Sequence, residues 1–338
     1  MKFEKVMKPI KVLVLTDHSG HSAENSIYSL IREISLHPQC HSIYVASRGL
    51  KENNSFFFNS NRDALFGAKV GHDFEYNSKG SKYSEGLQQL NTKDFGLVFM
   101  RVPRPIPDSF LTWIEEIFNH AVIINKPSGI IETSNKSYLL NYPSLCPPMR
   151  LCNSIEEIKS FSKEFPIVLK PLRAYGGKGI LKVTSGFVDD GRNNYPFEKF
   201  FSVSENFDPE GYLGMKYLKN VNEGDKRILV VGGEIMASSL RLPAEDSWLC
   251  NVAQGGRSVP SEVTNDEINI IEKINKDLIR KGILIYGVDT LTDDDGKRIL
   301  SEINTLSIGG FPQAQSQSGR PIISQTIQKM FSYVNDSR

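Results

Sequence analysis

Short apolar runs alternate with polar segments in the first part of the chain. The run 11–16 is apolar and β-branched, and a polar turn at 17–20 separates it from an amphipathic stretch over about 23–36. Apolar runs of this kind predict buried strands, and the amphipathic stretch predicts a helix. Further strand candidates lie at 43–46, 95–100 and 121–124. This succession predicts an α/β fold that begins with an open, parallel, Rossmann-like sheet.

The segment 51–91 shows little hydrophobic periodicity and is rich in Asn, Ser and Gly. Such a composition predicts long loops. Proline and glycine then occur together in the segment 125–129, where they interrupt regular structure strongly. We therefore expect a first domain over residues 1–127.

Helices and hairpins are expected in the rest of the chain. The pair Ser154 and Glu157 forms a capping box before a helix over 155–165. The pair Thr264 and Glu267 forms a second one before a longer amphipathic helix.

Two β-hairpins are predicted by pattern. The first joins apolar runs at 166–170 and 180–183 through a glycine-rich turn. The second joins the runs 283–291 and 298–304 through an acidic turn that contains glycine.

Composition narrows the classes of function. The chain has 338 residues, of which 39% are hydrophobic, and its 40 basic residues nearly balance 39 acidic ones. A net charge of +1 leaves no global field that would hold nucleic acid or an acidic membrane surface. No run approaches the roughly 18 apolar residues of a spanning helix, and the cysteines have no zinc-site spacing. We expect a cytoplasmic protein with reduced thiols and no nucleic-acid or membrane partner.

The second hairpin contains two acids and an amide that can meet on one face. Leu300, Glu302 and Asn304 share a face because side chains alternate along a strand. With the turn centred between 294 and 295, Asp289 lies opposite Leu300 and diagonal to Glu302, about 7–8 Å away at Cα. Two carboxylates and a carboxamide suit Mg²⁺, whose other ligands would be phosphate oxygens and water. The alternative is a solvated strand face, but the flanking apolar residues indicate a covered sheet, where unpaired carboxylates are costly.

The glycine-rich turn of the first hairpin can approach an anion closely. Within 176–179 only Lys178 has a side chain beyond hydrogen, and it adds positive charge. No Walker A sequence occurs in the chain, and the turn joins two strands, so it is not a P-loop. Taken alone, such a turn is more often a mobile loop than a phosphate cradle. Lys170, at the end of an apolar run, favours the cradle, although an edge strand with its lysine in water is the alternative.

Asp225 lies in a polar loop that leads into the strongly apolar run 228–231. A carboxylate at the entrance to a buried strand could hold the hydroxyl groups of a nucleotide ribose.

Taken in order, these features resemble the ATP-grasp ligases, and among them prokaryotic glutathione synthetase. The resemblance covers nearly the whole chain, and it rests on an ordered set of motifs at compatible spacing. The motifs comprise Arg101 with Pro103 and Pro105, Lys126 and Pro127 with Asn135 and Lys136, Lys170 and Pro171 with Gly176 and Gly177, Tyr217 and Leu218, the run 223–227, Asn251 with Gly255 and Gly256, and Asp289 with Glu302 and Asn304.

The resemblance implies an ATP-grasp fold, α+β in its catalytic part, behind the Rossmann-like N-terminal domain. It divides the remaining chain into a small subdomain with a glycine-rich lid over 128–214 and a C-terminal subdomain with metal and substrate sites over 215–338.

The resemblance also implies a role for individual residues. The ATP-binding group would comprise Lys136 and Lys170 at the phosphates, Gly176, Gly177 and Gly179 in the lid, Lys216, Tyr217 and Leu218 at the adenine edge, and Asp225 at the ribose. The Mg²⁺ ligands would be Asp289, Glu302 and Asn304, with two ions expected and Mn²⁺ as the alternative metal. Arg241 would lie beside the transferred phosphoryl group, and Arg101 and Asn251 would bind substrate.

The reaction implied is phosphoryl transfer from ATP to a substrate carboxylate, followed by attack of an amine on the acyl phosphate. In this family the pair is γ-glutamylcysteine and glycine. We expect small-molecule carboxylate and amine partners, and a homo-oligomer.

Three departures bear on the substrates. Leu249 stands where the family has an arginine, the continuation after Asn304 differs from the family's usual one, and the segment 51–91 is an insertion. A ligase for another peptide or amino-acid pair, or an ATP-binding protein without ligase activity, are therefore the alternatives. A dinucleotide-dependent dehydrogenase has little support, because no G-x-G-x-x-G follows the first strand.

Overall fold

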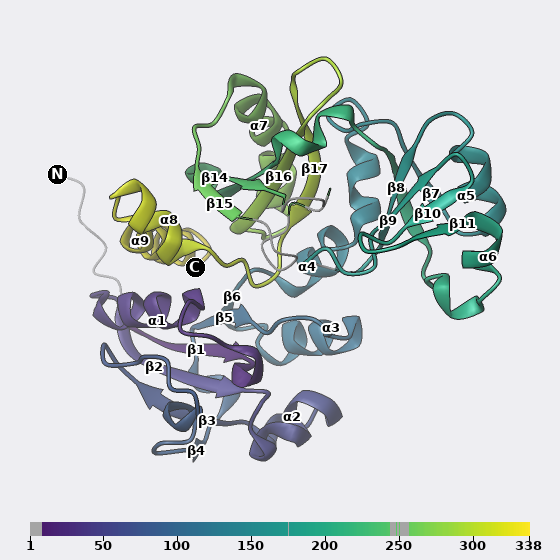
Figure 1. The fold of residues 1–338 in the computed structure, drawn as a ribbon. Helices are drawn as coiled ribbons and strands as arrows, with labels where there is room; N and C mark the ends of the chain where they lie inside the picture. Colours follow the sequence, from purple (N-terminus) through teal and green to yellow (C-terminus); the bar gives the residue numbers. More distant parts are fainter. Residues whose placement is uncertain (1–8, 175, 244–247, 249, 251–256) are drawn as a thin grey trace.

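The computed structural model describes residues 9–174, 176–243, 248, 250 and 257–338. Within these residues the strands form three β-sheets that follow one another along the chain. Figure 1 shows the first sheet at the bottom of the view, the second at the right and the third at the top. Helices and strands alternate through much of the chain, which confirms the predicted α/β class.

The first sheet has the strand order β4-β3-β2-β1-β5-β6. Its strands are β1 (Ile10–Thr16), β2 (Cys40–Ser47), β3 (Phe66–Val70), β4 (Gln88–Gln89), β5 (Leu97–Arg101) and β6 (Val122–Ile124). The helices of this part are α1 (Ser26–Leu36), α2 (Asn54–Asn59), α3 (Asp108–Ile117) and α4 (Pro127–Thr133). Strands β1, β2, β5 and β6 are parallel as predicted, whereas β3 and β4 pair antiparallel at one edge.

The prediction of long loops over 51–91 was wrong. The segment contains α2, β3 and β4, and the buried side chain of Asn53 connects it to the sheet. The Asn53 amide donates to the carbonyl oxygens of Ser47 and Phe66, both at 3.0 Å, and its oxygen accepts from the Phe66 N–H at 2.8 Å. Strands this short show no alternation that periodicity could detect, and one buried amide fixes their position.

The second and third sheets are antiparallel. The second has the order β11-β10-β9-β8-β12-β7 and the third β15-β14-β13-β16-β17. The second contains β7 (Met149–Cys152), β8 (Ile167–Pro171), β9 (Leu181–Thr184), β10 (Phe187–Asp189), β11 (Asn194–Pro196) and β12 (Tyr212–Lys216), with α5 (Ile155–Phe161) and α6 (Phe197–Phe201). The third contains β13 (Asp225–Val231), β14 (Glu234–Leu242), β15 (Arg257–Pro260), β16 (Ile285–Thr292) and β17 (Arg298–Asn304), with α7 (Asn265–Arg280).

Short 3₁₀ helices connect these elements. They are η1 (His18–Gly20), η2 (Lys51–Asn53), η3 (Arg62–Ala64), η4 (Ser81–Tyr83), η5 (Thr92–Asp94), η6 (Lys136–Asn141), η7 (Ser204–Asn206) and η8 (Lys219–Glu223). None of the helices in the described part of the chain is both long and apolar enough to span a membrane.

The predicted capping box of α7 is confirmed, and its Glu267 also forms buried ion pairs. The Thr264 side chain accepts from the Glu267 N–H, and the Glu267 carboxylate accepts from the Thr264 N–H at 2.8 Å. Glu267 is fully buried, and Lys226 and Arg298 each donate to it at 3.0 Å. This cluster holds α7 against β13 and β17.

The C-terminal helices pack back onto the first sheet. They are α8 (Phe311–Ser318) and α9 (Ile322–Asp336), drawn in yellow beside α1 in Figure 1. Ile323, Ile327, Met330 and Val334 recur every three or four residues on α9 and share one apolar core with α1 and β1. The last helix therefore completes the core of the first sheet.

Asn125, at the predicted boundary between the first two domains, is a buried junction. It follows β6 directly, and its amide donates to the carbonyl oxygens of Ile285 at 2.6 Å and Thr305 at 2.8 Å. Its oxygen accepts from the N–H groups of Leu284 and Ile285 at 2.9 Å. Asn125 thus ties the first sheet to β16 and to the residue that follows the edge strand β17. The domain limits after residues 127 and 214 stay predictions, and the second falls inside β12.

Candidate active site

A buried ion-pair cluster on the third sheet forms the centre of the site. Arg227 of β13 lies across from Asp289 of β16, and Arg241 of β14 lies across from Asp225 of β13. Arg227 donates to both carboxylate oxygens of Asp289, one of them at 2.7 Å. Arg241 donates to both oxygens of Asp225, at 2.7 and 2.5 Å, and reaches Asp289 at 2.9 Å. Bidentate pairs of this kind fix the positions of the guanidinium groups.

The arginines determine the charge of the acids. Burial would raise the pKa of Asp289, but Arg227 and Arg241 outweigh it and hold that pKa below its usual range. Burial raises the pKa of Asp225, since Arg241 offsets only part of the effect and Asp289 adds to it. Burial would likewise lower the pKa of Arg241, but Asp289 and Asp225 raise it above its ordinary value. Arg241 therefore stays charged beside Asp289.

A β-bulge at Ser301 brings Glu302 directly opposite Asp289. The register of β16 and β17 shifts by one residue there, because Thr290 pairs with Leu300 whereas Asp289 pairs with Glu302. The predicted diagonal arrangement, with Asp289 opposite Leu300, was therefore wrong. The prediction centred the turn between 294 and 295, whereas Thr292 pairs with Arg298 and the turn centres on 295. It also assumed a regular ladder, and the bulge inserts one further residue into β17. The Asn304 amide lies on the same side and donates to Asp289 at 3.4 Å.

Two buried lysines reach this edge of β17. The Lys170 ammonium donates to the backbone carbonyl of the bulged Ser301 at 3.0 Å and to its hydroxyl at 2.9 Å. Lys136 pairs with Glu302 at 3.3 Å. Lys170 is 8% exposed and β8 lies between β9 and β12, so the alternative of an edge-strand lysine in water was wrong. Burial lowers the pKa of Lys170, and the charge of Glu302 offsets part of that.

An inter-sheet cavity separates the second sheet from the third. Several of the predicted site residues line it together, namely Lys170, Lys216, Tyr217, Leu218, Asp225, Asp289 and Glu302. Val168, Met215 and Leu291 supply apolar walls. A cavity with apolar walls and one charged end suits a nucleotide, with the base between the walls and phosphates at the lysines. Its volume in this structure is about 80 Å³, below the roughly 300 Å³ of most ligand pockets.

A second, cationic cavity of about 310 Å³ meets the first at Glu302. Its lining includes the positive side chains of Arg104, Lys136, Arg173, Arg227 and Arg241. Asn304 and Gly176 line it as well. Gly176, Gly177 and Gly179 all have positive φ, between 66° and 76°, a conformation that favours glycine. A Cβ at Gly176 would meet no atom within 4 Å, so backbone conformation and not packing requires glycine there.

Arg101 lies apart from these cavities but is itself unusual. It ends β5 with only 6% of its surface exposed, and its Nε has no hydrogen-bond partner among the described residues. Burial lowers its pKa to about 10. An uncompensated buried guanidinium is costly, which points to an anion binding beside it. Asn251, the other predicted substrate residue, lies outside the described residues.

The metal-ligand set fits Mg²⁺ in its chemistry. Asp289, Glu302 and Asn304 supply oxygen ligands from one face of the hairpin, as Mg²⁺ prefers. Among the described residues no group of three or more His, Cys, Asp or Glu could hold a metal. Phosphate oxygens and water would therefore have to complete its coordination.

Comparison with known proteins identifies the family. The model of the prokaryotic glutathione synthetase ATP-grasp domain matches residues 135–319, more than half of the chain. The chain belongs to this ATP-grasp family. It is therefore a C–N bond-forming ligase, and the resemblance inferred from the motifs is confirmed. The family uses ATP with a divalent metal.

Curated relatives agree with this family. The glutathione synthetase of Mesorhizobium japonicum is 28% identical over 268 residues, which cover 78% of this ligase and 82% of the relative. The glutathione synthetase of Neisseria meningitidis is 27% identical over 263 residues, 75% of this ligase and 77% of the relative.

Solved structures show the fold. The D-alanine-D-alanine ligase of Coxiella burnetii has a TM-score of 0.64 at 14% identity and covers 98% of this ligase and 96% of its own chain. A D-cycloserine synthetase has the same TM-score at 10% identity, and the match covers 96% of this ligase and 99% of the synthetase. Together with the family match, these confirm the predicted ATP-grasp fold.

Sequence reasoning did not single out three arginines that line the cationic cavity. Arg227 was noticed only as part of a motif. It lies two residues after Asp225 on β13, and residues two apart share a face of a strand, so it could have been placed on the face of Asp225. Arg104 and Arg173 gave no such signal, since they come from loops that meet only in the folded chain.

Proposed function

We propose that this ligase activates a substrate carboxylate as an acyl phosphate with ATP and joins it to an amine. The observation that supports this best is the cluster around Asp289. Cations from η6, β8, β13 and β14 converge on two carboxylates where the inter-sheet and cationic cavities meet. Such an arrangement neutralises phosphate charge, which is most of what phosphoryl-transfer catalysis requires.

ATP would bind between the second and third sheets. We assign its phosphates to Lys136 and Lys170, its adenine edge to the backbone of 216–218, and its ribose to Asp225, which lines the inter-sheet cavity with Lys170. The lid glycines Gly176, Gly177 and Gly179 would close over the phosphates and exclude water from the acyl phosphate. Two Mg²⁺ ions held by Asp289, Glu302 and Asn304 would supply further positive charge at the phosphates.

The donor carboxylate would bind in the cationic cavity, with another anionic group of the donor at Arg101. A carboxylate oxygen bonds to the terminal phosphorus while the bond between that phosphorus and the ADP oxygen breaks. The amine nitrogen then bonds to the acyl carbon, the bond from that carbon to the phosphate oxygen breaks, and the nitrogen loses a proton. Arg241 lies where it can stabilise the charge of both steps. We take γ-glutamylcysteine as the first donor to test and glycine as the reference amine.

The test is ADP release from ATP with γ-glutamylcysteine, with and without an amine, together with hydroxylamine as a trap for the acyl phosphate. We expect hydroxamate to form only when donor and ATP are both present. Arg241→Met should slow the reaction about 10²–10³-fold, whereas Arg192→Met, at an exposed turn of the second sheet, should not. ATP turnover that requires no carboxylate donor would contradict the proposal.

A further inference from the structure

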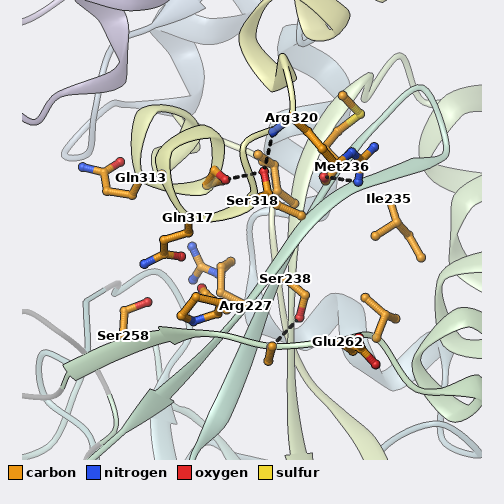
Figure 2. Close-up of a pocket in the computed structure, with 18 of the residues that line it drawn as sticks. Arg227, Ile235, Met236, Ser238, Ser258, Glu262, Gln313, Gln317, Ser318 and Arg320 are labelled. Carbon is orange, nitrogen blue, oxygen red and sulfur yellow. Dashed lines mark hydrogen bonds between the residues drawn. The ribbon is translucent and has the colours of Figure 1, made fainter.

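A third cavity, the α8 pocket, lies between helix α8 and the outer strands of the third sheet. Its volume is about 600 Å³. Figure 2 shows α8 above the strands, with Gln317 extending from the helix toward Arg227 and Ser258. Ser238 of β14 lies on the strand side and hydrogen-bonds to Ser261 at 2.9 Å.

The α8 pocket and the inter-sheet cavity both adjoin the cationic cavity, but at different residues. It shares Arg227, Arg241 and Gly309 with the cationic cavity. The inter-sheet cavity shares Glu302 with the cationic cavity, and no described residue lines both the inter-sheet cavity and the α8 pocket. The two arginines therefore separate the space proposed for the donor from the α8 pocket. A reaction with three reactants needs three such spaces around one centre.

The α8 pocket is too large for the reference amine. At roughly 30 Å³ for each water-sized group, a volume of about 600 Å³ accommodates on the order of twenty heavy atoms. Glycine would leave most of that volume to water, and so would gain little from the walls. A peptide of a few residues fills it.

The lining is mostly apolar, with side chains such as Leu229, Ile235 and Val263, and it also has polar groups and charges of both signs. Hydroxyl and amide groups come from Ser239, Ser258, Gln317 and others of their kind. Arg320 donates to the Met236 carbonyl at 3.2 Å, and no carboxylate of the described residues forms an ion pair with it. Glu262 lies at another part of the pocket, so its charge and that of Arg320 are separated in Figure 2. Such a pocket is complementary to a zwitterionic chain with a free carboxylate.

We propose that the α8 pocket binds the amine acceptor, and that the acceptor is a short peptide, longer than glycine, whose carboxylate Arg320 holds. This inference rests on the proposed ligase reaction and specifies its second substrate. The acceptor's amino nitrogen would reach the acyl carbon beside Arg241, form the C–N bond and release its proton as phosphate leaves.

The first test compares acceptors of rising length. With ATP and γ-glutamylcysteine held saturating, we expect kcat/KM to rise about tenfold or more from glycine to triglycine, because each added group gains contacts. Triglycine amide, which lacks the carboxylate, should be a poorer acceptor than triglycine. In Arg320→Gln that preference for the free carboxylate should disappear.

The second test blocks the pocket. Gln317→Trp should lower the ratio of the triglycine rate to the hydroxylamine rate about tenfold, because hydroxylamine is small enough to bypass the pocket. Ser316→Trp, at an exposed neighbouring position of α8 that does not line the pocket, should leave the ratio unchanged.

The outcomes separate the two proposals. If hydroxamate forms but glycine is the best acceptor, or if Gln317→Trp leaves the ratio unchanged, the inference is overturned while the ligase reaction stands. If no hydroxamate forms with any donor, the proposed reaction fails and the inference falls with it.

Discussion

Replacing Lys170 by methionine tests the assignment of the phosphate site. The ammonium group has three donor hydrogens, and two are used by the carbonyl and hydroxyl oxygens of Ser301. The third is available to a phosphate oxygen in the inter-sheet cavity. A charge-assisted hydrogen bond contributes about 1.5–3 kcal/mol. At about 1.4 kcal/mol for each tenfold change, Lys170→Met should weaken nucleotide binding about 10- to 150-fold.

Stability should change far less than affinity. Methionine keeps most of the buried volume and removes the cost of burying an ammonium group, while two hydrogen bonds to Ser301 are lost. These effects oppose each other, so we expect a net change in unfolding free energy below about 2 kcal/mol. Affinity is measured by calorimetric titration with Mg²⁺ and a non-hydrolysable ATP analogue, and stability by urea unfolding. Lys199→Met, at an exposed position on α6, is the matched control.

The result that would refute this reasoning is a loss of stability with unchanged nucleotide affinity. Lys170 would then serve only to hold the bulge at Ser301, and the phosphates would have to bind elsewhere.

Three further predictions concern other charged side chains, at Glu302, Arg101 and Glu267. Glu302→Gln should raise the Mg²⁺ concentration needed for ATP turnover, and an unchanged metal titration would remove Glu302 from the ligand set. Arg101→Met should stabilise the ligand-free protein by about 1–3 kcal/mol, seen as a higher melting temperature, while raising the KM for the donor; a loss of stability would mean that the guanidinium is already compensated. Glu267→Gln should cost about 3–5 kcal/mol at pH 7, because it leaves buried cations unpaired. Burial would raise the pKa of Glu267, but its hydrogen bonds and Lys226 lower it below the ordinary 4.5. Its stabilisation is therefore present above pH 4.5 and is lost as the pH falls, so in urea unfolding the difference between variant and wild type should narrow at acid pH.

Local features of the sequence were read correctly where one segment determines its own structure. The parallel strands β1 and β5 are largely continuous apolar runs, as strands buried on both faces are. The cap of α7 needs only Thr264 and Glu267, three residues apart. The acids of the second hairpin fall on one face because of simple alternation.

Features that depend on contacts between distant segments could not be read this way. The bulge at Ser301 is accompanied by contact with Lys170, which lies on another sheet. Asn53 and Asn125 resemble ordinary turn residues in the sequence, yet each is buried and bridges segments that meet only on folding. Arg104 and Arg173 line the cationic cavity from separate loops. Periodicity reports none of these, because it contains no information on tertiary pairing.

The packing of α9 against α1 and β1 bears on how the protein is made. During synthesis the first sheet leaves the ribosome early, and N-terminal units generally fold first. Here the apolar face of α9, from Ile323 to Val334, belongs to the same core as β1 and is translated long after it. Until α9 is translated, α1 alone covers part of this side of the first sheet, and the apolar surface that α9 later contacts stays exposed. Early intermediates of this ligase should accordingly bind chaperones through the surface that α9 later covers.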